Sequence, residues 1–284
     1  MERADGAPGA GDSHTMTLVD GRALGFAEFG PAGGVPLFFF HGGGSNRLTR
    51  HPDDTILDDL GVRLITIDRP GIGLSDHQPR RKLLDWPDDA AQLADHLGID
   101  TFSVLGWSAG GPHALACAYK IPHRLRAVGV MSGLAPPHWP GITTLATPLG
   151  IGVRTLAMSW AWCRSDVTAQ RPRAIARAGQ PDIKPSHRQG LRDLVQAREW
   201  QRITELAMLA RPWGFRLLDI TTTVHLWCGL RDRLTPPYMA VYLHRELPSA
   251  RLTLWDGEGH HGGFTHWRQV VAALTTFSYD PTSR

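Results

Sequence analysis

The sequence predicts an α/β protein built on a doubly wound, mostly parallel sheet. Short runs that are apolar on both faces recur along the 284-residue chain, and helical patterns separate them. Strands with two apolar faces belong in a buried parallel sheet, and a regular alternation of strand and helix implies crossover connections that wind such a sheet. The length suits one α/β domain that carries an insertion.

The predicted strands begin with a hairpin and continue as buried runs. Residues 16–29 alternate apolar with small or polar residues around Asp20-Gly21, which is a strong hairpin signal. The buried runs follow in chain order at 35–40, 62–67, 102–105, within 125–131, 224–227 and 251–255.

Helical patterns lie between these runs. Residues 83–97 place apolar side chains at helical spacings, with Asp85 and Pro87 in positions typical of a helix N-terminus. Residues 109–119 are small and apolar, as expected of a helix packed on a sheet. Two further helices are predicted at 237–247 and 267–277.

One long segment interrupts the alternation. Residues 134–215 contain no convincing strand and read as helices rich in Ala, Arg and Trp. A helical insertion of this length between two core strands predicts a cap, since long insertions are often functional. The predicted organisation is therefore a flexible tail at 1–14, a core at 15–133 and 216–284, and a cap at 134–215.

Composition narrows the class of protein. The net charge is only +3, and the three lysines (Lys82, Lys120 and Lys184) form no basic run, so nucleic-acid binding is not expected. The three cysteines have no C-x-x-C spacing, which favours reduced thiols in the cytoplasm over a zinc or redox site. The polar N-terminus lacks the apolar core of a signal peptide, and no apolar run could span a bilayer.

A serine stands at a predicted strand-to-helix turn. Residues 106–110 read Gly-Trp-Ser-Ala-Gly, the pattern G-x-S-x-G, between a predicted strand and a predicted helix. In that context the pattern holds a nucleophile, because the glycines leave room for a turn that larger residues would block. Ser108 would then lie beyond the sheet edge at the positive end of a helix, which favours a developing anion.

A serine nucleophile requires a base that accepts its proton and an acid that orients the base. The expected order along the chain is serine, acid, histidine. Asp232 follows the strand at 224–227 and is the candidate acid, since no acidic residue directly follows the strand within 125–131. Asp256 and Glu258 are closer in sequence to the candidate histidines, but nearness within a loop does not aim a carboxylate at a ring nitrogen.

Two adjacent histidines compete for the role of base. His260 and His261 follow the last predicted strand, in a loop at residues 256–261 that we call the histidine loop. The Gly-x-Gly-His spacing favours His260, and His261 remains the rival. With Ser108 and Asp232, His260 would lie at the carboxyl ends of parallel strands, where ligands bind in open α/β sheets.

The loop after the first buried strand is rich in glycine. Residues 41–44 read His-Gly-Gly-Gly, and glycines let a backbone approach a substrate closely. An oxyanion hole needs two backbone N–H groups aimed at the carbonyl oxygen of the substrate. The candidates are the amides of Ala109 and of Gly43, with Gly42 and Gly44 as alternatives to the latter. Ala109 comes directly after Ser108 in the strand-to-helix turn at residues 106–110, which we call the elbow.

Together these motifs resemble the α/β-hydrolase superfamily, in its capped branch with a serine nucleophile, which includes esterases and haloperoxidase-like and C–C hydrolase-like members. Residues 68–75, Asp-Arg-Pro-Gly-Ile-Gly-Leu-Ser, are similar to the D-x-x-G-x-G-x-S turn of the capped members. The resemblance covers about residues 16–280 and implies the α/β-hydrolase fold, with a helical cap after the strand equivalent to the sixth of the family.

Two differences from other branches of the superfamily limit which members this sequence resembles. Epoxide hydrolases and haloalkane dehalogenases carry an aspartate at the elbow, so Ser108 argues against those activities. Hormone-sensitive-lipase-like esterases share the HGGG loop, but they place the cap largely at the N-terminus, whereas the insertion here follows a later strand.

The chemistry implied is acyl transfer to Ser108 from a carboxylic ester of a small, apolar or aromatic substrate, with no metal or organic cofactor. Two alternatives use the same residues: hydrolysis of a C–C or lactone bond, and a ligand receptor with slow hydrolysis. The expected partner is the small-molecule substrate, and a homodimer is left open. The tryptophans of the cap either favour an apolar substrate or fill the cap core; they are Trp139, Trp160, Trp162, Trp200 and Trp213.

Overall fold

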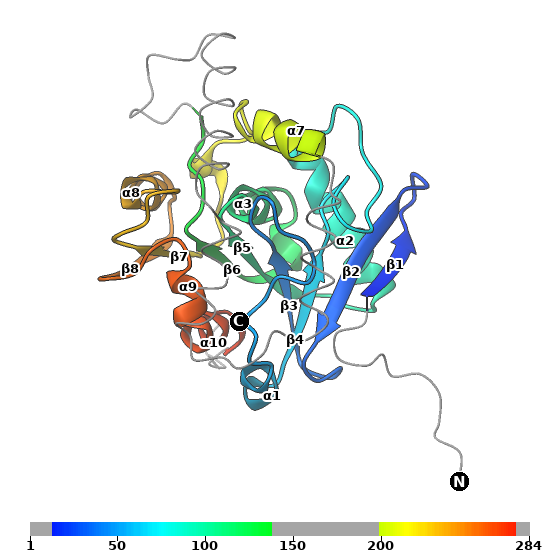
Figure 1. The fold of residues 1–284 in the computed structure, drawn as a ribbon, viewed down its shortest axis with the longest axis horizontal. Coiled ribbons are helices and arrows are strands. Elements are labelled where there is room, and N and C mark those ends of the chain that lie inside the picture. The colour runs from blue at the N-terminus through cyan, green and yellow to red at the C-terminus, as the bar shows by residue number, and fades with distance from the viewer. Residues whose placement is uncertain (1–12, 138–198, 277–284) are drawn as a thin grey trace.

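The computed structural model describes residues 13–137 and 199–276. These residues form one eight-stranded sheet of order β1-β2-β4-β3-β5-β6-β7-β8 (Figure 1). β1 pairs antiparallel with β2, and β2 with β4, while every other pairing is parallel, so the predicted α/β-hydrolase fold is confirmed. The strands are β1 (Ser13–Thr17), β2 (Ala23–Phe29), β3 (Val35–Phe40), β4 (Val62–Ile67), β5 (Phe102–Trp107), β6 (Leu125–Met131), β7 (Val224–Gly229) and β8 (Ala250–Trp255).

The strand order reverses at β3, which pairs with β4 on one side and with β5 on the other. Loops that leave neighbouring strands at such a reversal diverge, and the crevice between them is where ligands bind in open α/β sheets. Phe40 of β3 pairs with Gly106 of β5. The glycine-rich loop and the serine elbow therefore leave the sheet side by side, at what we call the carboxyl edge, formed by the carboxyl ends of β3 to β8.

Helices cover both faces of the sheet (Figure 1). Within the described residues the α-helices are α1 (Thr55–Leu60), α2 (Trp86–His96), α3 (Gly110–Lys120), α7 (Glu199–Leu209), α8 (Pro237–Glu246), α9 (Gly262–Thr265) and α10 (Trp267–Thr275). The same residues form the short 3₁₀ turns η1 (Leu83–Asp85), η2 (Pro122–Arg124) and η4 (Leu217–Asp219).

The alternation of side chains along β3 divides the core into two layers. Phe38 and Phe40 lie in the layer that α2, α3 and α8 cover, whereas Leu37 and Phe39 lie in the layer of α1 and α10. Successive residues of a strand point to opposite faces, so a run that is apolar throughout supplies both layers. The core thus holds both faces of the central strands rigid and fixes where their carboxyl ends lie.

Most predicted elements have the predicted position, and the differences are local. β3 and β4 match the apolar runs residue for residue, while β5 and β7 each extend two residues further, to Trp107 and Gly229. The helix predicted from residue 83 begins as the 3₁₀ turn η1 and becomes α-helical only at Trp86. The short helices α1 and α9 were not predicted; α9 is Gly-Gly-Phe-Thr, which carries no helical pattern.

The predicted tail ends earlier than expected. β1 begins at Ser13, and Ser13 and His14 pair with Ala27 and Phe26 of β2, so these two residues belong to the sheet. The guanidinium of Arg47 also donates to Ser13 Oγ at 3.0 Å, which anchors the start of the strand.

Most of the predicted cap, residues 138–198 with Trp139, Trp160 and Trp162, lies outside the described residues, as do residues 1–12. The described end of the cap segment forms α7, followed by the buried Trp213. No helix in the described ranges, 13–137 and 199–276, has the length and apolar character needed to cross a membrane.

Candidate active site

Ser108 lies at the tip of a strained turn. β5 ends at Trp107, α3 begins at Gly110, and Ser108 between them has a φ of 55°, in the left-handed region that L-residues rarely adopt. A Cβ on Gly106 would lie 2.3 Å from the Gly110 carbonyl oxygen, and one on Gly110 would lie 2.0 Å from that of Phe40. Only glycine fits these two positions, so the G-x-S-x-G pattern reflects close packing of backbone on backbone.

The candidate acid and base form a buried pair. His260 Nδ1 donates to Asp232 Oδ2 at 2.9 Å, and Asp232 Oδ1 accepts the backbone N–H groups of Leu234 and Thr235, each at 2.9 Å. Burial alone would raise the pKa of Asp232, but the hydrogen bond and charge of His260, with the donors of Thr235, outweigh it and hold the pKa below its ordinary value. The carboxylate is thus fixed as an acceptor for the imidazole.

Thr235 is a member of this cluster that the sequence analysis missed. Its hydroxyl lies 2.8 Å from Asp232 Oδ2, 3.1 Å from His260 Nδ1 and 2.8 Å from the carbonyl oxygen of Ser132. A threonine three residues after an aspartate is a local turn signal that could have indicated the contact. The hydroxyl links the acid loop after β7 to the end of β6.

The other imidazole nitrogen of His260 is free within the described structure. Nε2 is buried and has no hydrogen-bond partner there, the Ser108 hydroxyl included. Catalytic hydrogen bonds are often unformed in enzymes without a ligand. With Nδ1 donating to Asp232, the lone pair of a neutral imidazole lies on Nε2, which is the tautomer that a general base requires.

Trp107, the residue before Ser108, brings the histidine loop to the elbow. Its indole N–H donates to the backbone carbonyl of His260 at 3.1 Å, and the two rings lie 5.5 Å apart. The indole also packs against Gly42, where a Cβ would lie 2.8 Å from the ring. A single side chain therefore contacts the glycine-rich loop and the histidine loop on either side of Ser108.

The alternative candidates for the base, His261, and for the acid, Asp256 and Glu258, contact other residues. The His261 ring packs against Trp107 and Phe264, at 5.2 and 6.4 Å between centroids. The exposed Asp256 accepts the N–H of Gly257, and Glu258 pairs with His266 at 3.6 Å. Among these alternatives the structure brings only His260 and Asp232 together.

Two backbone amides at the carboxyl edge have their directions fixed by their peptide carbonyls. In a trans peptide the N–H points opposite to the C=O of the same unit. The Ser108 carbonyl accepts the N–H of Gly111 at 3.0 Å, which turns the Ala109 N–H the other way. The Gly42 carbonyl accepts His41 Nδ1–H at 2.8 Å, which does the same for the N–H of the half-buried Gly43. Both predicted oxyanion amides are thus oriented by bonds from within the protein.

A buried charge network lies behind the glycine-rich loop. Arg69, two residues after the end of β4, donates to Glu205 of α7 through Nε and Nη2, the latter at 3.1 Å. Arg81 adds a contact to Glu205 at 3.3 Å. Burial would raise the pKa of Glu205, but the Arg69 guanidinium outweighs it and holds the pKa well below its usual range. Arg69 appeared in the sequence only as part of the D-x-x-G-x-G-x-S turn, and Glu205 carried no signal.

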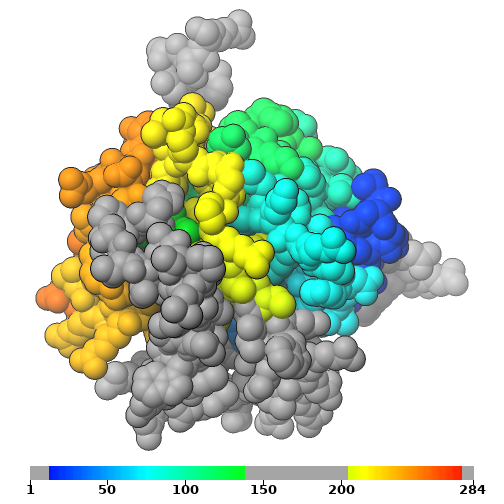
Figure 2. Space-filling view, turned by 90° about the horizontal axis from the view of Figure 1, so that it is seen from above, coloured from blue at the N-terminus to red at the C-terminus, as the bar shows by residue number. Residues whose placement is uncertain are grey.

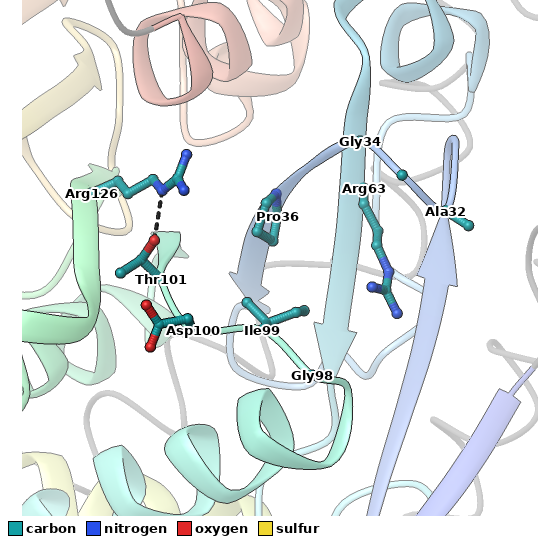
Figure 3. Close-up of a pocket in the computed structure, with 10 residues that line it drawn as sticks. Ala32, Gly34, Pro36, Arg63, Gly98, Ile99, Asp100, Thr101 and Arg126 are labelled. Atoms are coloured by element: carbon teal, nitrogen blue, oxygen red, sulfur yellow. Dashed lines mark hydrogen bonds between the residues drawn. The ribbon is translucent and has the colours of Figure 1, made fainter.

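The opposite edge of the sheet holds a shallow groove of about 320 Å³ around the amino ends of β3 to β6 (Figure 3). Its two arginines already have partners: Arg63 donates to Glu28 at 2.6 Å, and Arg126 to Thr101 at 2.8 Å. We call this side the amino edge. Across the described parts of the chain, no group of three His, Cys, Asp or Glu residues could hold a metal ion.

Comparisons with known proteins agree with this architecture. The family model described as the alpha/beta hydrolase fold matches residues 35–266, so the chain belongs to that family and is a hydrolase of the α/β fold. It is 28% identical over 253 residues to a pimeloyl-[acyl-carrier protein] methyl ester esterase of Neisseria meningitidis, covering 85% of this chain and 92% of that protein.

Two further matches have less specific names. The uncharacterized hydrolase YcgS of Bacillus subtilis is 27% identical over 213 residues, which are 74% of this chain and 72% of that protein. A hydrolase from Pseudomonas aeruginosa PA01 superposes with a TM-score of 0.70 at 18% identity, covering 94% of this chain and 99% of that one. The latter likeness supports the fold.

Proposed function

We propose that this protein is a serine esterase that cleaves a carboxylic ester of a small, apolar or aromatic substrate through an acyl-enzyme. The observation that carries the proposal is the buried Asp232–His260 pair, whose hydrogen bond of 2.9 Å leaves the Nε2 lone pair available beside the serine elbow. The methyl ester esterase of Neisseria meningitidis among the relatives supports an ester as the bond that is cleaved.

In the proposed reaction Ser108 Oγ attacks the ester carbonyl carbon while His260 Nε2 takes the hydroxyl proton. The negative charge that develops on the carbonyl oxygen is stabilised by the N–H groups of Ala109 and Gly43. His260 then gives the proton to the departing alcohol, and Asp232 stabilises the imidazolium. In the second half His260 activates a water molecule, which hydrolyses the acyl-serine and releases the acid.

The geometry at the elbow supports Ser108 as the nucleophile. A residue held at a φ of 55° stores strain that a fold retains only where its surroundings enforce the conformation, and such positions cluster at active sites. The Trp107 ring next to the serine packs edge to face against Phe264, with ring centroids 4.9 Å apart, and this packing helps to hold the turn in place.

The test is hydrolysis of p-nitrophenyl esters from acetate to decanoate, with labelling by a fluorophosphonate read by intact mass. The wild-type protein should turn over at least one ester repeatedly and gain one phosphonyl group at Ser108. Ser108→Ala should lose both reactions, with a fall in kcat of roughly 10⁴-fold or more, and should keep its melting temperature.

A matched control comes from the same strand. Ser103 is also a buried serine of β5, and its hydroxyl donates to the Leu274 carbonyl at 2.6 Å, away from the elbow. Ser103→Ala should lower stability by about 1 kcal/mol and leave kcat unchanged. One slow turnover with tight retention of the ligand would instead indicate a receptor, and repeated turnover in Ser108→Ala would refute Ser108 as nucleophile.

A further inference from the structure

The Arg69 guanidinium has every side directed at an acceptor. Nη1 donates to the carbonyl oxygen of His41, Nη2 to that of Gly42 at 3.3 Å, and Nε with Nη2 to the carboxylate of Glu205. The Arg69 and Glu205 side chains are 0% and 2% exposed. A planar guanidinium held by a two-point ion pair cannot rotate freely, so its remaining N–H groups point in fixed directions.

Those directions fix two peptide units of the glycine-rich loop. The carbonyl of His41 belongs to the same peptide as the N–H of Gly42, and the carbonyl of Gly42 to the same peptide as the N–H of Gly43. Because C=O and N–H are opposed in a trans peptide, Arg69 turns both N–H groups away from itself. The Gly43 N–H is one of the two amides proposed for the oxyanion hole, and the Gly42 N–H is an alternative to it.

The glycines of the loop make the hydrogen bonds from Arg69 necessary. A glycine backbone adopts many conformations that other residues cannot, so a run of three glycines does not hold its peptide planes by itself. His41 Nδ1 and the backbone N–H of Ser45 also donate to the Gly42 carbonyl, at 2.8 and 3.3 Å, but both donors lie on the loop and move with it. Arg69 follows β4, and its anchor is on α7, so both lie outside the loop.

Glu205 connects this support to the segment predicted as the cap. Figure 2 shows the yellow residues that begin in α7 lying between the cyan and the orange parts of the molecule. Glu205 of α7 accepts from Arg69 and Arg81, which belong to the segment after β4. The position of α7 and the orientation of the loop amides therefore depend on the same carboxylate.

We propose that Arg69 is a positioning residue for the oxyanion hole and that Glu205 holds it in place, so that α7 sets the direction of the Gly42 and Gly43 N–H groups. This inference rests on the proposed esterase function. It assigns to Arg69 and Glu205 an effect on the transition state, which carries the oxyanion, and little effect on binding of the neutral ester.

The experiment compares Arg69→Lys, Arg69→Met and Glu205→Gln with the wild-type protein. Lysine keeps the charge but cannot reach two carbonyls and a carboxylate at once, whereas methionine removes every bond. Loss of one oriented oxyanion donor typically lowers kcat by 10²–10³-fold. We expect kcat to fall about 100-fold in Arg69→Met and about tenfold in the other two, with KM changed less than about threefold.

The affinity for a trifluoromethyl ketone that adds to Ser108 distinguishes loss of the oxyanion hole from general damage to the fold. Its tetrahedral adduct carries the oxyanion, so its affinity should fall by the same factor as kcat/KM across the three variants. The rate of phosphonylation by a fluorophosphonate should fall in the same order, and this rate needs no ester substrate.

Asp89→Asn is the matched control. The buried Asp89 forms a two-point pair with the partly buried Arg22, at 3.1 and 2.7 Å, between the β1–β2 hairpin and α2. Its loss should lower the melting temperature as Glu205→Gln does, but leave kcat, inhibitor affinity and labelling unchanged. If Glu205→Gln and both Arg69 variants label and turn over like the wild type, the inference is wrong while the esterase stands. A wild-type protein that neither labels nor hydrolyses esters overturns both.

Discussion

The two edges of the same sheet use polar residues in opposite ways. At the carboxyl edge they are buried and bonded to one another, as in the Asp232–His260 and Arg69–Glu205 pairs. At the amino edge the arginines lie at the rim of an open groove and are less deeply buried. The Arg63 and Glu28 side chains are 19% and 13% exposed, and Arg126 donates to Thr101 (Figure 3). Burying charge is costly unless every partner is held in place, and the cost falls as a pair becomes more exposed to water.

Backbone strain shows the same contrast. In the loops that lead into the amino ends of strands, the described positions with positive φ are glycines, for example Gly61 and Gly98. At the carboxyl edge glycines such as Gly44 and Gly73 also adopt positive φ, but two serines do so as well, Ser108 and Ser132, at 55° and 46°. The carboxyl edge therefore keeps strained backbone that lowers stability, which is the pattern expected where function constrains a fold.

The largest effect should come from Asp232→Asn. The amide would present an N–H to His260 Nδ1 and so favour the tautomer with its proton on Nε2, which cannot accept a proton from Ser108. We expect kcat to fall about 10⁴-fold with the melting temperature nearly unchanged, measured by ester hydrolysis and thermal unfolding. Asp256→Asn, an exposed carboxylate in the histidine loop, should retain full kcat. Equal losses in the two variants would contradict the role of Asp232.

Much of the carboxyl edge could be predicted because its local signals are strong. Runs that are apolar on both faces located β3 and β4, and the glycines of the elbow marked a turn that no larger residue fits. Asp232 followed from the order of acid and base along the chain, because it lies in the loop after a predicted strand. These signals lie within a few residues of the side chains they position.

The remainder of the site depends on contacts between distant segments. Arg69 and Glu205 are 136 positions apart, and no pattern near either residue indicates the other. Thr235 and Trp107 are a helix-flanking threonine and a strand-end tryptophan, ordinary residues whose contacts with His260 exist only once β5, β7 and β8 are in register. Tertiary packing, not local propensity, decides such contacts.

A second prediction compares a fully buried pair, Arg69–Glu205, with a partly exposed pair, Arg63–Glu28. Glu205→Gln leaves the Arg69 and Arg81 charges without a carboxylate, and should lower the free energy of unfolding by about 3 kcal/mol at pH 7. Glu28→Gln, which unpairs Arg63 at the amino edge, should cost at most about 1 kcal/mol. Urea unfolding of both variants measures the two values, and equal values would remove the contrast between the edges.

The pH dependence of that difference has a definite sign. The pKa of Glu205 lies below its ordinary 4.5 in the folded protein, because Arg69 and then Arg81 outweigh burial. The nearby His41 and His113 stay neutral, since burial and then Arg69 hold the pKa of each well below the ordinary value. A carboxyl group whose pKa is lower in the folded than in the unfolded protein stabilises the fold fully above the unfolded-state pKa, about 4.5. This stabilisation is lost as the pH falls from about 4.5 toward the lower folded-state pKa. The gap between wild type and Glu205→Gln should therefore be full at pH 7 and shrink below about pH 4.5.

The smallest effect concerns strain at the elbow. Ser108→Gly and Ser108→Ala both remove the hydroxyl, but only glycine adopts a φ of 55° without steric cost. Ser108→Gly should therefore be more stable than Ser108→Ala by about 1 kcal/mol in urea unfolding, with both inactive. At the amino edge Gly98 has a φ of 66° and open space where a Cβ would lie, so Gly98→Ala should lose about the same amount through backbone strain alone and keep full activity. If glycine gave no gain at Ser108 while alanine cost stability at Gly98, the elbow would be unstrained and the contrast between the two edges would rest on charge alone.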